Sequence, residues 1–161
     1  EMTWKRGVDM LSFGGTKNGC WCAEAVVLFD PAMAAEFAFI HKRAAQLFSK
    51  ARFVSAQFEA YFRDGLWLET ARHSNAMAAS LADGFRNSAS TRLAWEPQAN
   101  EVFAIMDQDV AERLQRQGAV FYPWHAPAGF DGEMAPDEGV YRFVTSFATT
   151  RQDVEAFRAM L

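Results

Sequence analysis

A lysine in a glycine-rich turn is the most chemically suggestive feature of this sequence. The largely apolar stretch at residues 8–13 predicts a β-strand, and it leads directly into Gly14-Gly15, Thr16, Lys17 and Asn18-Gly19. A lysine held on a short turn, partly desolvated and near other cations, can lose its proton near neutral pH and act as a nucleophilic amine. The turn therefore has the residue types needed for covalent chemistry on an aldehyde.

Two interpretations of this turn are open on the residues alone. Glycines allow backbone amides to approach an anion closely, and Thr16 adds a hydroxyl donor. With Lys17 they could hold pyridoxal phosphate, the aldehyde cofactor most often bound to lysine as a Schiff base. The alternative is an ordinary glycine-rich turn with an exposed lysine. A Walker loop is excluded because it requires Gly-x-x-x-x-Gly-Lys-Ser/Thr.

The sequence around the turn resembles the low-specificity L-threonine aldolases, a pyridoxal-phosphate-dependent family of the aspartate-aminotransferase-like fold. The similar segments follow one another through nearly the whole chain, at residues 9–19, 23–29, 42–43, 47–53, 66–68, 100–103 and 141–147. The resemblance implies that Lys17 carries pyridoxal phosphate and that Arg142 binds the α-carboxylate of the substrate. It also implies that Lys42 lies near the active site. Thr16 could contact the cofactor phosphate or simply stabilise the turn.

Arg142 and Lys42 each have a simpler explanation from the residues alone. Arg142 lies inside a predicted strand, where it could be a solubilising charge on a sheet edge. A guanidinium also suits a carboxylate, because it offers two parallel hydrogen bonds to a planar anion. Lys42 belongs to a basic run with Arg43, Lys50 and Arg52, which could be a solvated helix face. The family's glycine-rich turn after this lysine is replaced here by residues 44–50, so Lys50 and Arg52 are not assigned as phosphate ligands.

The resemblance also predicts how the chain is organised. Family members are about twice as long, with the cofactor lysine past their middle, whereas here it is residue 17 of 161 and the chain starts at Glu1 without an initiator methionine. We expect the carboxyl-terminal half of an α/β enzyme. Residues 1–64 would end the cofactor-binding large domain, residues 65–91 would form a connecting helix and linker, and residues 92–161 a small α/β domain. The absent half would supply the histidine that stacks on the cofactor and the aspartate that pairs with its pyridine nitrogen.

The patterning predicts alternating strands and helices. Residues 8–13 and 25–29 read as strands of a parallel sheet, and Asp30-Pro31 reads as a helix start. A single apolar stripe over residues 40–61 and a second over residues 67–85 predict two helices interrupted at Asp64-Gly65. The remaining predicted elements are strands at 92–95, 102–106, 119–122 and 141–146, a helix at 108–117, a loop at 124–139 and a final helix opened by a Thr150/Asp153 capping box.

Composition narrows the function classes. The chain is 50% hydrophobic and 22% charged with a net charge of −4, which is typical of a globular protein and argues against nucleic acid as the main partner. No apolar run approaches the roughly 18 residues of a membrane span. Cys20 and Cys22 form neither a thioredoxin motif nor half of a common zinc site, and the three histidines share no ligand spacing, so no metal is expected. These features favour a cytoplasmic location. Some of the fifteen Phe and five Trp are expected to line an interface.

The resemblance to the threonine aldolases implies cleavage of L-threonine or allo-threonine to glycine and acetaldehyde, by a parent protein that is a homo-oligomer. The fragment by itself is expected to be inactive because half of the site is absent. Two alternatives are open. One is a related pyridoxal-phosphate lyase that acts on a bulkier β-hydroxy amino acid such as phenylserine, or that eliminates at Cβ. The other is a non-catalytic folding or oligomerisation module.

Overall fold

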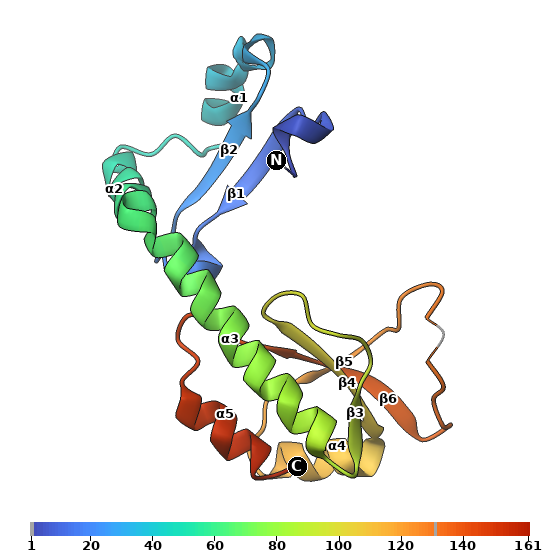
Figure 1. Cartoon of the computed structure of the whole chain (residues 1–161). Helices are drawn as coiled ribbons and strands as arrows, with labels where there is room; N and C mark the ends of the chain where they lie inside the picture. Colours follow the sequence, from blue (N-terminus) through green and yellow to red (C-terminus); the bar gives the residue numbers. More distant parts are fainter. Residues whose placement is uncertain (1, 131) are drawn as a thin grey trace. The chain divides into compact units, whose positions relative to one another are not determined.

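The chain forms two compact units, Glu1–Trp67 and Leu68–Leu161. The computed structural model describes residues 2–130 and 132–161, so Glu1 of the predicted large domain and Asp131 of the predicted loop lie outside the described residues. None of the described helices combines the length and the apolar character that crossing a membrane requires. The helices and strands of both units are labelled in Figure 1.

Unit 1 contains a pair of strands followed by short helices. Strand β1 (Met10–Gly14) pairs with β2 (Glu24–Leu28) in antiparallel register, with Met10 opposite Leu28 and Gly14 opposite Glu24. The expectation of parallel strands here is wrong. The connection between them is too short for the crossover that parallel neighbours require, so the chain reverses as a hairpin.

The helices of unit 1 are shorter than the apolar stripe predicted. Helix α1 (Phe37–Arg43) ends well before α2 (Ala51–Phe62), so residues 40–61 do not form one helix. Ala45 lies between them at φ 57°, a left-handed conformation that does not continue a helix. Asp30 acts as a cap as predicted and accepts a hydrogen bond from the Ala32 amide at 2.9 Å, but the segment that it caps is a 3-10 turn, Pro31–Ala34. The interruption predicted at Asp64-Gly65 is confirmed, with Asp64 at φ 53°.

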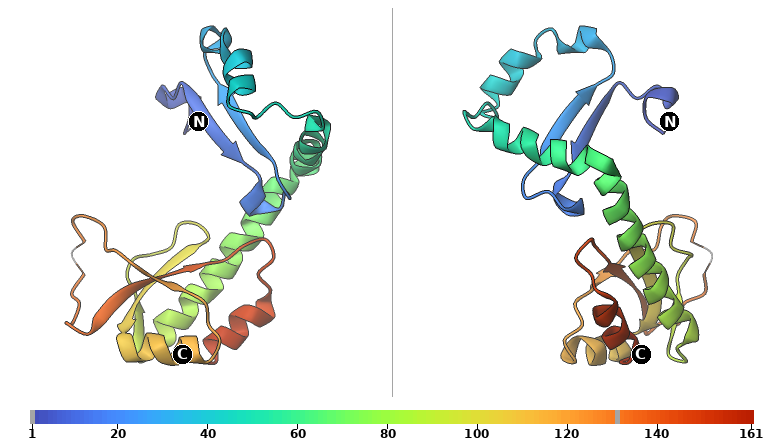
Figure 2. Two further views of the ribbon diagram at one scale, coloured as in Figure 1. Left: turned by 180° about the vertical axis from the view of Figure 1, so that it is seen from behind. Right: turned by 60° about the vertical axis from the view of Figure 1, so that its left-hand side comes forward.

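Helix α3 (Leu66–Asn87) leads the chain into unit 2, whose four strands form one antiparallel sheet. The strands are β3 (Thr91–Leu93), β4 (Glu101–Asp107), β5 (Tyr122–Trp124) and β6 (Glu138–Val144), in the order β3-β4-β6-β5. Helix α4 (Gln108–Arg116) ends before Gly118 at φ 100°, and α5 (Arg151–Arg158) begins with the predicted capping box. Figure 2 shows these helices beside the sheet.

Pro123 does not end a strand, contrary to the expectation for residues 119–122. It lies inside β5, paired with Tyr141 of β6. β5 is an edge strand, where a residue without an N–H costs no ladder hydrogen bond if that position faces away from the partner strand.

The core of unit 2 lies between one face of the sheet and the helices. In this core the most deeply buried large side chains are those of Phe85, Val102, Met106 and Leu114. Ile105 is equally buried but lies on the opposite face of the sheet. Phe85 of α3 lies 4.9 Å from Phe143 of β6 between ring centroids. Alternate residues of β4, at positions 102, 104 and 106, face this core. The residues between them therefore belong to the other face of the sheet.

An ion pair holds the carboxyl-terminal end of the loop between β5 and β6. Arg92 of β3 pairs with Glu138 at the start of β6 and donates a hydrogen bond to the Glu133 carbonyl oxygen at 2.6 Å. Glu138 also accepts a hydrogen bond from the Ala135 amide at 2.8 Å. Its hydrogen bond with Arg92, and next the one from Ala135, lower the pKa of Glu138 to about 2. The ionised carboxylate of Glu138, in β6, therefore connects this end of the loop to Arg92 in β3.

We predict that Glu138→Gln lowers the free energy of unfolding by about 1 kcal/mol at neutral pH. The folded-state pKa of about 2 lies below the ordinary value of 4.5, so the contribution of the carboxylate is complete above pH 4.5 and disappears as the pH falls toward 2. Urea unfolding of wild type and variant as a function of pH measures this difference. Glu133→Gln is the matched control, because Arg92 contacts only the backbone oxygen of Glu133. A wild-type-to-variant difference that does not shrink on acidification would contradict the assignment.

Candidate functional site

Lys17 lies in a 3-10 turn, Thr16–Asn18, and the side chain of Asn18 anchors this turn to residues outside it. Asn18 Nδ2 donates to the Tyr61 hydroxyl at 2.6 Å and to the Trp67 carbonyl oxygen at 3.0 Å. Tyr61 is buried, so the turn is anchored on a fixed point of α2. Sequence reasoning missed this anchor, because Tyr61 lies far along the chain from Asn18.

The glycines before the lysine serve close packing. The Gly15 amide donates to the Ala23 carbonyl oxygen at 2.8 Å, so it is already engaged and does not offer itself to an anion as expected. A Cβ on Gly15 would lie 2.7 Å from Cys20 Sγ, and one on Gly14 would lie 2.3 Å from Glu24 Oε2. Gly15 is therefore required by packing against the buried Cys20, whereas a side chain at position 14 would only have to displace the flexible end of Glu24.

The Thr16 hydroxyl is engaged within the turn, and Lys17 is more exposed than the sequence suggested. The Thr16 hydroxyl donates to Glu24 Oε1 at 2.6 Å, an arrangement that stabilises the turn. Lys17 is exposed, so the described residues of this chain do not supply the partial desolvation that was expected of it. An exposed primary amine on an anchored turn is nevertheless accessible to an aldehyde, which is the chemistry that pyridoxal phosphate needs from a protein lysine. In that respect Lys17 fits the cofactor.

The connection after the turn is tied to α2 by a second side chain. Gln57 Oε1 accepts hydrogen bonds from the amides of Trp21 at 2.8 Å and Cys22 at 3.0 Å. Cys20 is buried and Cys22 is exposed, and both are free thiols. Burial, and next the neighbouring Glu24 carboxylate, raise the pKa of the Cys20 thiol. The two thiols therefore differ in their access to reagents.

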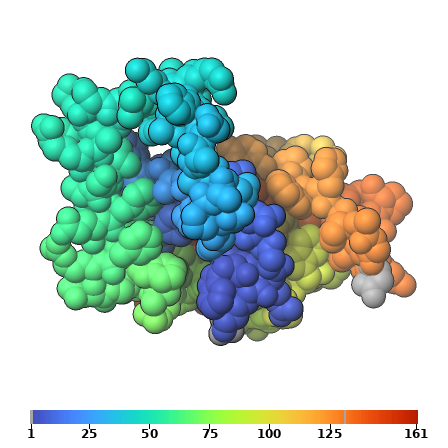
Figure 3. All heavy atoms as spheres, turned by 90° about the horizontal axis from the view of Figure 1, so that it is seen from above, coloured from blue at the N-terminus to red at the C-terminus, as the bar shows by residue number. Residues whose placement is uncertain are grey.

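Lys42 lies in the last turn of α1, in the same unit as Lys17 but on a different element, and its side chain is exposed. Figure 3 shows the α1 segment, in light blue to cyan, at the molecular surface. Arg142 lies in unit 2.

Arg142 lies in β6, between β4 and β5, so the explanation as an edge-strand charge is wrong. Its guanidinium carbon lies 4.3 Å from the ring centroid of Trp124 on β5. Nη1 lies 3.4 Å from Glu101 Oε1 on β4. The Nε atom is buried and has no hydrogen-bond partner among the described residues. The guanidinium is thus stacked on an indole, and one of its N–H groups is not used by any described residue.

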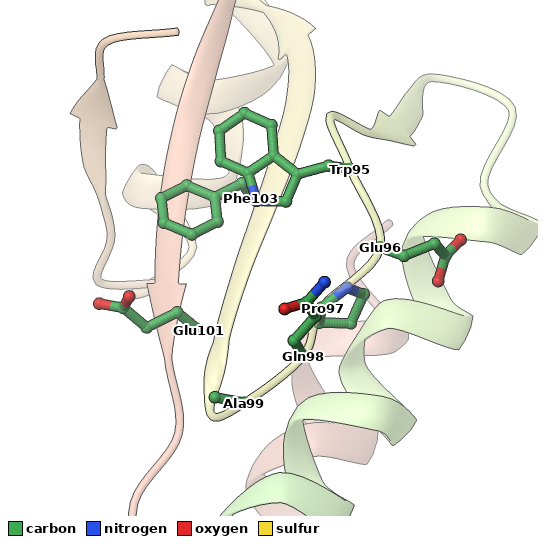
Figure 4. A pocket seen from close by; sticks show the side chains of 7 residues that line it. All are labelled: Trp95, Glu96, Pro97, Gln98, Ala99, Glu101 and Phe103. Carbon is green, nitrogen blue, oxygen red and sulfur yellow. The ribbon is translucent and has the colours of Figure 1, made fainter. Parts of the chain in front are cut away.

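An open hollow of about 440 Å³ is lined in part by Glu101, the residue that contacts this arginine (Figure 4). The rings of Trp95 and Phe103 form one wall, with 4.5 Å between their centroids, and Glu101 and Gln98 lie at the other side. Phe103 is opposite Arg142 in the β4–β6 register. Sequence reasoning found Arg142 but not Glu101 or Trp124. Side chains alternate between the two faces along a strand, so the strand pattern could have placed Arg142, Glu101 and Trp124 on one face. This would have required knowing that β5 extends to Trp124.

We predict that Asn18→Ala loosens the Lys17 turn and exposes Cys20. Loss of two hydrogen bonds, one to a buried hydroxyl, should accelerate alkylation of the Cys20 thiol by roughly 5- to 30-fold, while the exposed Cys22 thiol reacts at an unchanged rate. Mass spectrometry of peptides after timed iodoacetamide labelling measures both thiols in one sample. Tyr61→Phe should produce part of the same effect, since it removes one of the two acceptors. Equal acceleration at both cysteines would indicate general unfolding and contradict a local anchor.

Comparison with known proteins gives relatives of one kind. No protein-family model matches the chain. It is 36% identical to the low-specificity L-threonine aldolase of Pseudomonas aeruginosa over 160 residues. This match spans 99% of the chain and 42% of the relative. The chain is 39% identical over 129 residues to the low-specificity L-threonine aldolase of another Pseudomonas strain, covering 80% of this chain and 37% of the relative.

A solved structure gives the same result for the fold. The structure of Leishmania major threonine aldolase superimposes with a TM-score of 0.82 at 27% identity, covering 96% of this chain and 42% of that one. The resemblance and the mixed α/β fold class expected from the sequence are confirmed, and the extent of the match fits a carboxyl-terminal part. In sequence and in fold, this chain, which spans about two fifths of the length of the relatives it matches, is related to the low-specificity L-threonine aldolases.

Proposed function

We propose that a protein containing this chain is a pyridoxal-phosphate-dependent lyase that cleaves L-threonine and allo-threonine to glycine and acetaldehyde. The observation that carries this proposal is the 36% identity to a low-specificity L-threonine aldolase over 99% of the chain, which includes the Lys17 and Arg142 segments. The structure adds an exposed amine on an anchored turn and an arginine with unused hydrogen-bonding capacity. These are the two groups that such a reaction needs from this part of the protein.

In this proposal Lys17 binds the cofactor covalently through its ε-amino group. The amine is exposed to an incoming aldehyde, and the bonds from Asn18 to Tyr61 and Trp67 keep the turn from moving away. Pyridoxal phosphate, when bound, supplies an electron sink for the electrons released when the Cα–Cβ bond breaks. Lys17 contributes attachment and a nitrogen that can hold or give up a proton at that position.

Arg142 is proposed to bind the α-carboxylate of the amino acid. Its guanidinium is planar, positively charged and stacked on Trp124, so it can bind a carboxylate in a defined orientation. Fixing the carboxylate also fixes which bond at Cα is aligned for cleavage. Its role is therefore both affinity and orientation.

Thr16 and Lys42 are proposed at the phosphate and at the edge of the cofactor site, respectively. A hydroxyl has one proton, so Thr16 can donate to a phosphate only when it releases Glu24. Lys42 is exposed and long, so it can reach an anion near its helix without a change of backbone. Both roles are secondary to that of Lys17.

We further propose that residues 1–64 complete a cofactor-binding domain together with protein outside this chain, that residues 65–91 connect it, and that residues 92–161 form the small domain. Unit 1 exposes large apolar side chains, among them Trp21 at 84%, Phe39 at 69% and Leu47 at 61%. Such surface supports burial against further protein, including a second subunit of a homo-oligomer. Two free thiols are in keeping with a reducing, cytoplasmic compartment. The chain alone is proposed to be inactive.

We predict that one equivalent of pyridoxal phosphate, added to the chain and trapped with borohydride, labels Lys17. Peptide mass mapping should find the pyridoxyl group on Lys17 in wild type and in the control Lys50→Ala, and should not find it in Lys17→Ala. The same mixture should release no acetaldehyde from L-threonine. Labelling that moves to Lys42 or spreads evenly over the lysines would overturn the proposed attachment.

We predict that Arg142→Lys, introduced into an active enzyme that contains this chain, reduces kcat/KM for L-threonine by about 10- to 100-fold. Loss of a charged, two-pronged hydrogen bond to the carboxylate has this magnitude, and a lysine cannot reproduce its geometry. Steady-state assays with L-threonine, allo-threonine and phenylserine should show a loss for all three, since each carries the same carboxylate. Arg116→Lys on the exposed face of α4 is the control and should behave as wild type. Unchanged kinetics in Arg142→Lys would remove the arginine from the site.

A further inference from the structure

Arg142 already has an anionic partner within the chain. Glu101 of β4 lies opposite Val144, and Phe103 lies opposite Arg142, so the glutamate is the diagonal neighbour of the arginine on the same face of the sheet. Glu101 Oε1 lies 3.4 Å from Arg142 Nη1. A carboxylate of the protein therefore approaches the group to which the proposed substrate carboxylate would bind.

This internal ion pair is weak. A charge-assisted N–H···O bond is usually about 2.7–2.9 Å long, and here the separation is 3.4 Å. The side chains are also accessible to water, at 30% for Arg142 and 45% for Glu101. A pair of this kind changes an equilibrium constant by no more than about fivefold. The buried Nε is left without a partner among the described residues, so Glu101 does not use the full capacity of the guanidinium.

Glu101 also has space into which its side chain can move away from Arg142. It lines the hollow beside Trp95 and Phe103, which is open and has a volume of about 440 Å³ (Figure 4). Glu96 lines the same hollow but is paired with Arg86 of α3. Both glutamates line the hollow, but they contact different arginines, which makes Glu96 a natural control.

We propose that Glu101 is a displaceable counter-ion that occupies Arg142 until the α-carboxylate of an amino acid replaces it. The proposal rests on the proposed role of Arg142. Glu101 is then a positioning residue that acts through the arginine, holding it in place while competing with the ligand. Competition of this kind lowers the affinity of every carboxylate by a similar factor, so a ligand needs further contacts to recover that affinity.

The sign of the effect separates this role from a structural one. If Glu101 competes, Glu101→Gln should bind a carboxylate about two- to fivefold more tightly than wild type, because the neutral amide attracts the guanidinium less. If Glu101 only supports the fold, the same substitution should weaken binding or leave it unchanged. Glu96→Gln should leave binding unchanged in either case. Glu101→Ala is a second variant of the same expected sign, should the amide alter the strand.

Nitrogen-15 NMR of the 161-residue chain tests the proposal through the side-chain Nε–H resonance of Arg142, assigned by its disappearance in Arg142→Lys. L-threonine is titrated as the ligand, and L-threoninamide, which lacks the carboxylate, is the control. Tighter threonine binding in Glu101→Gln or Glu101→Ala, with no response to the amide, supports the proposal. Threonine binding that is detected only in these variants, and not in wild type, also supports the proposal. Equal or weaker binding in these variants overturns the proposal and leaves the role of Arg142 intact. No response of the Arg142 resonance in wild type or in either variant overturns both.

Discussion

The pairing of β4 with β6 determines two properties of unit 2 at once. In its observed register, Val102 and Ala104 face the helices together with Phe143, while Glu101, Phe103 and Arg142 share the other face. A shift by one residue would exchange the two sets and place a guanidinium in the apolar core. Burial of the aromatic core therefore also fixes the arginine, its glutamate and the hollow beside them. The proposed binding chemistry depends on a register that hydrophobic packing enforces.

Unit 1 is built differently. Its buried apolar residues among those described are Cys20, Ala23 and Tyr61, and specific polar bonds replace a large core. Asn18 and Gln57 each join the region around the lysine turn to α2, one through a buried hydroxyl and the other through two backbone amides. This network fixes the turn locally even though most of the surrounding surface is exposed. It explains how a reactive lysine can be positioned in a unit with little apolar burial of its own.

Sequence reasoning succeeded where the signal is local. The capping box at Thr150, the glycine after α4 and the interruption at Asp64 are each set by residues within a few positions. It failed where the outcome depends on distant partners. Apolar runs do not reveal strand direction, so the β1–β2 pair was expected to be parallel. Pro123 ends a strand only if its missing N–H is needed, and that depends on its place in the sheet.

The same distinction applies to the site. Lys17 stands out because a glycine-rich turn and an amine are adjacent in the sequence, and Arg142 stands out because a charge interrupts an apolar strand. Asn18 with Tyr61, and Glu101 with Arg142, are contacts across 43 and 41 positions, for which the sequence gives no local sign. The mixed α/β class followed from the alternation of patterns. The anchoring of the turn and the partner of the arginine required coordinates.

The ion pair between Arg92 and Glu138 also has a consequence for how this region can vary in evolution. These residues hold the carboxyl-terminal end of the β5–β6 loop, and the pairing of β5 with β6 already brings the two ends of the loop together. Lengthening a loop whose ends are already joined adds only a small, logarithmic entropy cost. Insertions at positions 125–129 should thus be accommodated without changing strand pairing, which makes this loop a suitable site for carrying a foreign epitope or for divergence between relatives.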